Sequence, residues 1–320
     1  MARSSVIIPA YNSAASLPAS IEAALAQTQP ALEILVIDDG STDDTPAVAA
    51  RYGDRIRLLR QANAGQGAAR NHGLREARGE FVTFLDADDC WEPDFLAVME
   101  PFLAAHPKLV AASCAFAAER GAGVYHGPDN YRALAEHHPN GLILDDFFAF
   151  WADKDHIRTG TALIRRSAID QAGFQNPDLR ISQDLEYWAL LATLGPWGLM
   201  PRVLWRGGSV AAAKKTGWRR KYAARRKRTP SIEAWQARVV PRLSRAQARS
   251  FAVVRGRVAS NFALSQILGG DPGVARGLVG AYGADFPGGV TPRIMQRGHA
   301  LGSLGWRAAC LALQMRDRMK

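Results

Sequence analysis

The chain has 320 residues and a formal net charge of +10, with 48% hydrophobic and 22% charged residues. This composition is that of a globular protein with a sizeable core, and it excludes a disordered chain. The three cysteines lie far apart without C-x-x-C spacing, which excludes a disulfide framework or zinc site and fits a reducing cytosol. Since no stretch approaches the ~20 apolar residues of a spanning helix, a cytoplasmic protein is expected.

The positive charge is concentrated in one stretch. Between Arg202 and Arg228 there are eleven Lys and Arg residues and no Asp or Glu. The remainder holds 29 basic and 30 acidic residues, so the basic character needs a local explanation.

The first 90 residues alternate between strand and helix patterns. Apolar runs predict strands over 4–9, 33–37, 56–60 and 81–85. Helical spacing predicts helices over 17–28, 42–52 and 65–77. Four strands alternating with three helices predict an α/β fold, with a parallel sheet covered by helices on both faces.

The residues at the carboxyl ends of these strands are mainly polar. They are Tyr11, Asn12, Asp38, Asp39, Asn63, Gly65, Asp86, Asp88 and Asp89. Ligands of such sheets bind at this edge, so these residues are expected to converge in one crevice. Asp86 and Asp88, one residue apart, can share a hard divalent cation. An acidic turn that caps the next helix is the alternative, and the convergence favours the ligand site.

The stretch from Gly65 to Arg70 is a poor match to the dinucleotide-binding fingerprint. Its sixth position is Arg, and it follows the third strand instead of the first. We interpret it as a turn into a helix whose Arg70 faces the crevice, with a surface arginine as the alternative.

Together these motifs resemble the inverting GT-A glycosyltransferases of family 2. The resemblance rests on four stretches in order, 6–12, 36–43, 63–71 and 84–89. It is specific over about the first 90 residues and continues more weakly to about Arg206. It implies a GT-A domain over residues 1–210, with a Rossmann-like, mostly parallel sheet. Residues 211–320 would form a basic, helical extension.

The resemblance also implies roles for single residues. The nucleotide would contact Pro9, Ala10, Tyr11, Asn12, Asp38, Asp39, Asn63, Gly65, Arg70, Asp86 and Ala87. Tyr11 would flank the base, and Asp39 would accept the N3–H of uracil, which favours a UDP-sugar. Asp88, with Asp86, would bind Mn²⁺ or Mg²⁺, a Lewis acid that neutralises the departing diphosphate.

The middle of the chain contains a candidate general base. A strand over 159–164 and a short helix over 167–172 precede an amphipathic helix that opens at Ser182. Relatives often carry Glu-Asp where this chain has Gln183-Asp184, and the resemblance makes Asp184 the base. An acidic residue in the first turn of a helix, favoured there by the dipole alone, is the alternative.

The C-terminal third combines a basic stretch with helical patterns. In residues 214–228, basic side chains are mixed with Trp218 and Tyr222. A solvated helix face, or contacts to an anionic diphosphate substrate, is the simplest interpretation. Peripheral contact with the inner face of the plasma membrane comes next, and nucleic-acid binding last. Helices are expected over 232–243, 247–268, 273–282 and 297–319, as an appendage or a dimerisation element.

The sequence is therefore interpreted as a metal-dependent inverting glycosyltransferase. It would move a sugar from a nucleotide-sugar donor to a glycan, lipid-linked or other hydroxyl acceptor, in cell-envelope or exopolysaccharide synthesis. A sugar-nucleotide nucleotidyltransferase is the main alternative, but the Gly-rich basic phosphate loop expected after its first strand is missing. A nucleic-acid-binding protein would leave the carboxylates at the strand ends unexplained.

Overall fold

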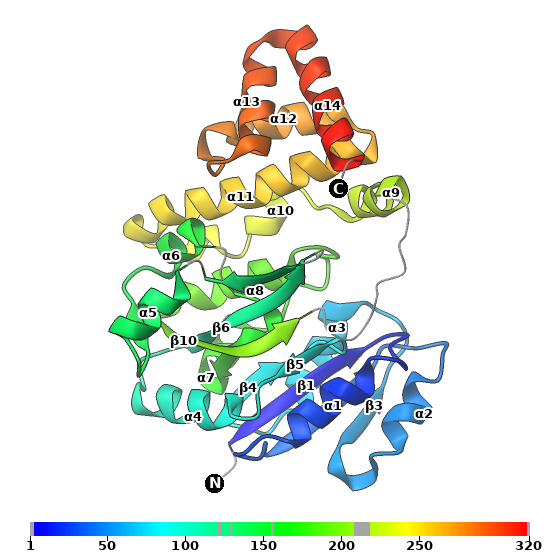
Figure 1. Cartoon of the computed structure of the whole chain (residues 1–320), viewed down its shortest axis with the longest axis vertical. Coiled ribbons are helices and arrows are strands. Elements are labelled where there is room, and N and C mark those ends of the chain that lie inside the picture. Colours follow the sequence, from blue (N-terminus) through cyan, green and yellow to red (C-terminus); the bar gives the residue numbers. More distant parts are fainter. Residues whose placement is uncertain (1–2, 121–122, 129, 155–156, 208–217, 319–320) are drawn as a thin grey trace. The chain divides into compact units, whose positions relative to one another are not determined.

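The computed structural model describes residues 3–120, 123–128, 130–154, 157–207 and 218–318 (Figure 1). The chain forms two compact units. The first, here the sheet unit, comprises Met1–Pro177 and Gln183–Ala213; the second, the helical unit, comprises Asp178–Ser182 and Lys214–Lys320. The domain boundary expected between residues 210 and 211 lies outside the described residues.

The sheet unit is built on a ten-stranded sheet. Eight of its strands follow the order β3-β2-β1-β4-β9-β6-β10-β5, and the other two, β7 and β8, pair with β6 and β10. The strands are β1 Ser4–Ala10, β2 Glu33–Asp38, β3 Arg57–Arg60, β4 Phe81–Phe84, β5 Asp89–Trp91, β6 Ala111–Arg120, β7 Gly123–Gly127, β8 Leu142–Leu144, β9 Ala162–Arg165 and β10 Trp197–Gly207. Strands β3, β2, β1 and β4 are parallel, as predicted. Beyond them β9 runs antiparallel to both β4 and β6.

Eight α-helices belong to the described part of the sheet unit. They are α1 Leu17–Leu25, α2 Thr45–Ala50, α3 Gln66–Glu76, α4 Phe95–Ala105, α5 Tyr131–His137, α6 Phe147–Asp153, α7 Arg166–Ala172 and α8 Gln183–Ala192. Helix α2 is shorter than the predicted 42–52. The Asn12 side chain accepts from the Thr42 amide (2.8 Å) and the Asp43 carboxylate from the Thr45 amide (3.0 Å), which holds the preceding residues in a turn. The strand predicted over 159–164 begins only at Ala162, after a 3-10 turn.

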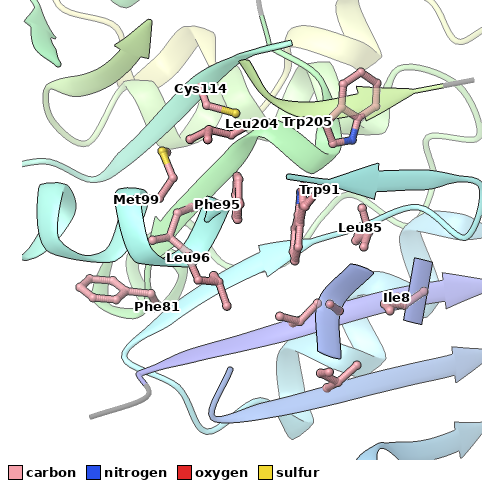
Figure 2. Packing of buried hydrophobic residues seen from close by; sticks show 14 of the residues in the cluster. Ile8, Phe81, Leu85, Trp91, Phe95, Leu96, Met99, Cys114, Leu204 and Trp205 are labelled. Atoms are coloured by element: carbon pink, nitrogen blue, oxygen red, sulfur yellow. The ribbon is translucent and has the colours of Figure 1, made fainter. Parts of the chain in front are cut away.

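The core of the sheet unit lies beneath the turn that follows β4. Figure 2 shows Trp91 between Leu85 and Phe95, with Leu204 and Trp205 close by. The Trp91 ring stacks on Phe95, with centroids 4.3 Å apart, and its indole N–H donates to the Gly160 carbonyl at 2.7 Å. This packing gives the end of β4 a rigid support.

Three of the four aromatic residues of α6 are also buried in the core. Phe147, Phe148 and Trp151 are at most 5% exposed, and the Phe147 ring stacks on Trp197 with centroids 4.3 Å apart. These three rings therefore pack inside the protein.

The helical unit consists of α9 Trp218–Arg228, α10 Ile232–Gln236, α11 Arg245–Gly269, α12 Pro272–Tyr282, α13 Val290–Ala300 and α14 Gly302–Arg318. A single helix over 297–319 is a wrong prediction, because Gly302 adopts a φ of +77° and separates α13 from α14. The helix predicted over 232–243 ends at Gln236 and is followed by a 3-10 turn that contains Pro241. None of the described helices combines the length and the apolar character needed to cross a membrane.

Part of the basic stretch is held within the helical unit. Residues 214–217 lie outside the described residues. A Cβ atom added to Gly269 of α11 would lie 2.8 Å from Arg226 Cβ and 2.9 Å from the Tyr222 carbonyl oxygen, so α9 packs closely on α11 there. The Arg226 guanidinium also lies 3.4 Å from the Asp271 carboxylate. These two residues of α9 therefore have a packing role.

Alanine substitutions at two helical glycines of the helical unit should change the free energy of unfolding in opposite directions. A Cβ atom on Gly256 would lie 1.9 Å from the Asp285 carbonyl oxygen, whereas one on Gly277 meets nothing within 4 Å. We expect Gly256→Ala to lower the free energy of unfolding by about 2–3 kcal/mol through overpacking. Gly277→Ala should raise it by about 0.5–1 kcal/mol, because alanine favours the helix. Thermal unfolding followed by circular dichroism would measure both, and equal effects would contradict the packing described.

Candidate functional site

The parallel strands bring their carboxyl ends to one edge of the sheet. Strand β1 leads into Tyr11 and Asn12, β2 ends at Asp38, and β4 leads into the turn at Asp86. Register pairs β1 directly with both β2 and β4. The predicted convergence of these strand ends therefore exists in the structure.

The turn after β4 fixes the directions of its carboxylates. The Asp89 amide donates to the Asp86 carbonyl at 3.0 Å, and the buried Ser20 hydroxyl donates to the carbonyls of Asp89 (2.8 Å) and Asp86 (3.2 Å). Ala87 points inward and is 7% exposed, whereas Asp88 is exposed and the Asp86 side chain is 23% exposed. The turn thus directs two carboxylates one residue apart to the surface of the sheet edge.

Arg70 is the cation of this site. Helix α3 begins after Gly65, whose φ of +93° turns the chain into the helix. The Arg70 side chain is only 1% exposed, and its Nη2 lies 2.7 Å from Asp86 Oδ1. Its guanidinium lies 5.8 Å from the centre of the Phe84 ring. Among the described residues, the Nε and Nη1 atoms have no hydrogen-bond partner, so this buried cation has donors left for a ligand.

Asp184 lies in the first turn of α8 and is half-buried. Burial raises the pKa of its carboxyl above the usual value; the positive charge of Arg70 opposes this rise and the negative charge of Asp86 adds to it. Asp184 is therefore within electrostatic reach of both partners of the Arg70–Asp86 ion pair. The structure brings together the three predicted residues Arg70, Asp86 and Asp184.

The two aspartates at the end of β2 are largely occupied by the protein itself. The buried Asp38 carboxylate accepts from the Ser41 amide (3.1 Å) and from Arg60 Nε (3.0 Å). Asp39, 3% exposed, accepts from the amides of Ala64 (2.9 Å) and Gly65 (2.8 Å). These bonds fix the loop before α3. A contact of Asp39 with uracil stays a prediction.

The other predicted nucleotide contacts differ in accessibility. The Tyr11 ring is 49% exposed at the end of β1, and Asn63 is exposed as well. Pro9 and Ala10 are buried within β1, so they would act through the position of the backbone. Asn12 has a φ of +50°, which its bonds to the turn at Thr42 hold in place.

Two carboxylates of the site suit a divalent cation. Partial burial of the Asp88 carboxyl, followed by the negative charge of Asp86, raises the pKa of Asp88. A hard divalent cation between the two would relieve this repulsion, and carboxylate oxygens are its preferred ligands. No cluster of three or more His, Cys, Asp or Glu side chains that could hold a metal occurs in the described part of the chain. The residues fit a cation that takes its remaining ligands from elsewhere.

Sequence reasoning missed two glutamines of this edge. Gln66 donates to Asp86 Oδ1 at 3.3 Å and accepts from Gln183 at 3.4 Å, which links α3 to the start of α8. Gln61 donates to Asp39 Oδ1 at 2.7 Å. Gln66 lies inside the stretch 63–71 that carries the family resemblance, but the predicted site residues of that stretch are Asn63, Gly65 and Arg70. Gln61 carries no signal in the sequence, since its position is decided by the pairing of β3.

Solved structures share this fold. Staphylococcus aureus TarS 1–349, determined in complex with UDP-GlcNAc, aligns with a TM-score of 0.63 and 17% identity over 99% of this chain and 92% of that chain. The mannosyltransferase PcManGT from Pyrobaculum calidifontis, in complex with GDP-Man and Mn2+, aligns with a TM-score of 0.56 and 20% identity over 98% and 87% of the two chains. At these identities the similarity shows the GT-A fold, as predicted.

Sequence relatives match just over a quarter of the chain. The "Uncharacterized glycosyltransferase YibD" of Escherichia coli (strain K12) is 48% identical over 88 residues, which are 27% of this chain and 26% of that protein. An uncharacterized glycosyltransferase of Nostoc sp. is 48% identical over 93 residues, 28% of this chain and 29% of its own. The match thus spans about a quarter of these relatives. The sequence pattern described as Glycosyl transferase family 2 matches residues 5–173, just over half of the chain. The chain therefore belongs to glycosyl transferase family 2.

Proposed function

We propose that this protein transfers a sugar from a nucleotide-sugar, with a UDP-sugar favoured, to an acceptor hydroxyl with inversion at the anomeric carbon. A glycan or lipid-linked acceptor, in cell-envelope or exopolysaccharide synthesis, is part of this proposal. The observation that carries it is the grouping at one sheet edge of a buried arginine, the partly buried Asp86, the exposed Asp88 and a half-buried base candidate. Family membership favours transfer over the nucleotidyltransferase alternative.

Asp184 is the proposed base. A neutral hydroxyl is a weak nucleophile, so a carboxylate must remove its proton as the oxygen attacks. The proton passes to Asp184, the acceptor oxygen bonds to the anomeric carbon, and the bond from that carbon to the diphosphate oxygen breaks. The nucleoside diphosphate leaves on the opposite side, so the configuration inverts. A raised pKa brings this carboxyl closer to the operating pH, which favours proton transfer.

Negative charge on the leaving diphosphate needs compensation at this edge. The Nε and Nη1 groups of the buried Arg70, which have no partner among the described residues, would donate charge-assisted hydrogen bonds to diphosphate oxygens and so neutralise part of this charge. Asp86 and Asp88 would hold Mn²⁺ or Mg²⁺, which when bound supplies Lewis-acid stabilisation of the diphosphate. The Mn2+ complex of PcManGT supports this choice of metal. The exposed Tyr11 ring offers a stacking surface for the base.

Replacing the proposed base should affect turnover but not nucleotide binding. Asp184→Asn should lower the turnover number by at least about 10²-fold, while nucleotide affinity stays near that of the unmodified protein. In the unmodified enzyme, activity should fall as the pH drops through the raised pKa of Asp184, because protonation disables the base. Initial rates against pH, with calorimetry for the nucleotide, would measure this. Turnover retained by the variant would exclude Asp184 as the base.

Arg70 should affect both the pH profile and stability. Its charge lowers the pKa of Asp184, so Arg70→Gln should move the acidic limb of the rate profile to higher pH. The same change breaks a mostly buried ion pair and should lower the free energy of unfolding by about 3 kcal/mol.

The matched control for this prediction is Arg3→Gln. It breaks the Arg3–Glu80 pair, whose side chains are 38% and 45% exposed, and should cost about 0.5 kcal/mol or less without changing the profile. A shift of the acidic limb in the control, or none in Arg70→Gln, would contradict the assigned electrostatics.

Nucleotide choice and metal use can be tested together. We expect calorimetric titration to detect UDP binding in Mn²⁺ that is lost in EDTA and in Asp88→Ala, because the metal links the carboxylates to the diphosphate. Asp54→Ala, at an exposed aspartate in the turn before β3, is the control and should bind normally. Tighter binding of GDP would keep the site and reject the role of Asp39. Tighter binding of dTDP would keep that role, because thymine carries the same N3–H as uracil, and would change only the preferred donor. No binding of any of the three would reject the proposed donor class.

A further inference from the structure

The two units of the chain carry opposite charges. The helical unit contains 23 Lys and Arg against 5 Asp and Glu, a net charge of +18. The sheet unit contains 17 basic and 25 acidic residues, a net charge of −8. The excess therefore extends over the whole helical unit, well beyond residues 214–228. A ligand of this unit should be anionic.

Helix α14 presents two apolar faces. One face is buried and includes Trp306 and Leu313, which are 5% and 2% exposed. The other is exposed: Leu304, Leu311 and Met315 are 78%, 60% and 63% exposed. With Ala308, these residues recur at the spacing of one helical face. Leu301, 73% exposed, lies at the turn before α14 and continues this face. Leu301, Leu304, Leu311 and Met315 are called the exposed stripe below.

The helix that carries these exposed residues is part of a closely packed helical hairpin, formed by α13 and α14. Helices α13 and α14 lie side by side in the helical unit (Figure 1). A Cβ atom on Gly298 of α13 would lie only 2.4 Å from Ala309 Cβ of α14, so the two backbones approach closely. The buried faces hold each other, and the exposed leucines cannot turn inward without breaking this contact.

Three exposed arginines lie on the same helical hairpin as these leucines. Arg307 lies on α14 between Leu304 and Leu311 in sequence, and on α13 the exposed Arg293 and Arg297 are one turn apart. An amphipathic helix that carries long aliphatic side chains beside cations is typical of a segment that lies in the interface of an anionic bilayer.

We propose that the α13–α14 hairpin docks this protein on an anionic phospholipid membrane. Leu301, Leu304, Leu311 and Met315 insert among the acyl chains, while Arg293, Arg297 and Arg307 pair with lipid phosphates. A second copy of the chain is a poorer occupant, because two units of charge +18 repel each other. Nucleic acid is also poorer, since exposed aliphatic side chains offer no stacking surface for bases. The proposal is independent of the transfer reaction.

Vesicle sedimentation of the full chain tests the proposal. The protein should bind vesicles of phosphatidylcholine mixed with phosphatidylglycerol, fail to bind phosphatidylcholine alone, and lose affinity as salt increases. Leu304→Ser with Leu311→Ser should weaken binding by about tenfold to a hundredfold, because two inserted leucines are lost. Val240→Ser with Val253→Ser is the control, since it changes exposed aliphatic residues outside the hairpin, and it should bind normally.

The charges are tested by two triple variants of equal net change. Arg293→Gln, Arg297→Gln and Arg307→Gln should together reduce binding at least about tenfold. Arg242→Gln, Arg245→Gln and Arg249→Gln, at exposed positions just before and in the first two turns of α11, should reduce it much less. Circular dichroism would check that all variants fold.

Three results would overturn the proposal. The first is vesicle binding that neither the leucine nor the hairpin arginine variant weakens. The second is an oligomer, detected by analytical ultracentrifugation, that the leucine variant dissociates, since the exposed stripe would then contact a second copy. The third is salt-sensitive RNA binding lost in the hairpin variants without any vesicle binding.

Discussion

A buried cation organises the candidate site. Arg70 is 1% exposed and pairs with Asp86 at 2.7 Å, so its charge is removed from water and depends on the carboxylates around it. Such a group costs several kcal/mol to bury without compensation. The same charge opposes the rise in the pKa of Asp184. Helix α3, strand β4 and helix α8 therefore depend on one guanidinium for their electrostatic balance at this edge.

The core supports this arrangement from below. Trp91 stacks on Phe95 and donates to the Gly160 carbonyl, while Ser20 binds two carbonyls of the turn that carries Asp86. These bonds are made to backbone and to rings, so they fix the turn without using its carboxylates. Asp86 Oδ1 is bound by Arg70 and Gln66, so Asp88 and the other oxygen of Asp86 are the atoms offered to a ligand. Partial burial, and after it the negative charge of Asp86, raises the pKa of Asp88. A site positioned in this way needs little rearrangement to accept a cation.

The two units have net charges of opposite sign, and this difference fits the different functions proposed for them. The sheet unit, at −8, would repel a nucleoside diphosphate, so binding there requires local cations such as Arg70 and a metal. The helical unit, at +18, attracts anions, and its exposed leucines add an apolar contribution. One chain can therefore combine a selective anion site with a general anionic surface contact, because the two depend on different residues.

The sequence alone determined the parallel start of the sheet and the residues at its carboxyl ends, because apolar runs and the motifs after them are local signals. It predicted Asp86, Arg70 and Asp184 as site residues, and their grouping follows from strand order. Tertiary structure decided which contacts occupy Asp38 and Asp39, that Gln61 and Gln66 join the site, and that three rings of α6 are core. It also decided the break at Gly302 and the exposed face of α14, since both depend on how α13 packs against α14. Periodicity marks an apolar face, but only packing decides whether that face is covered.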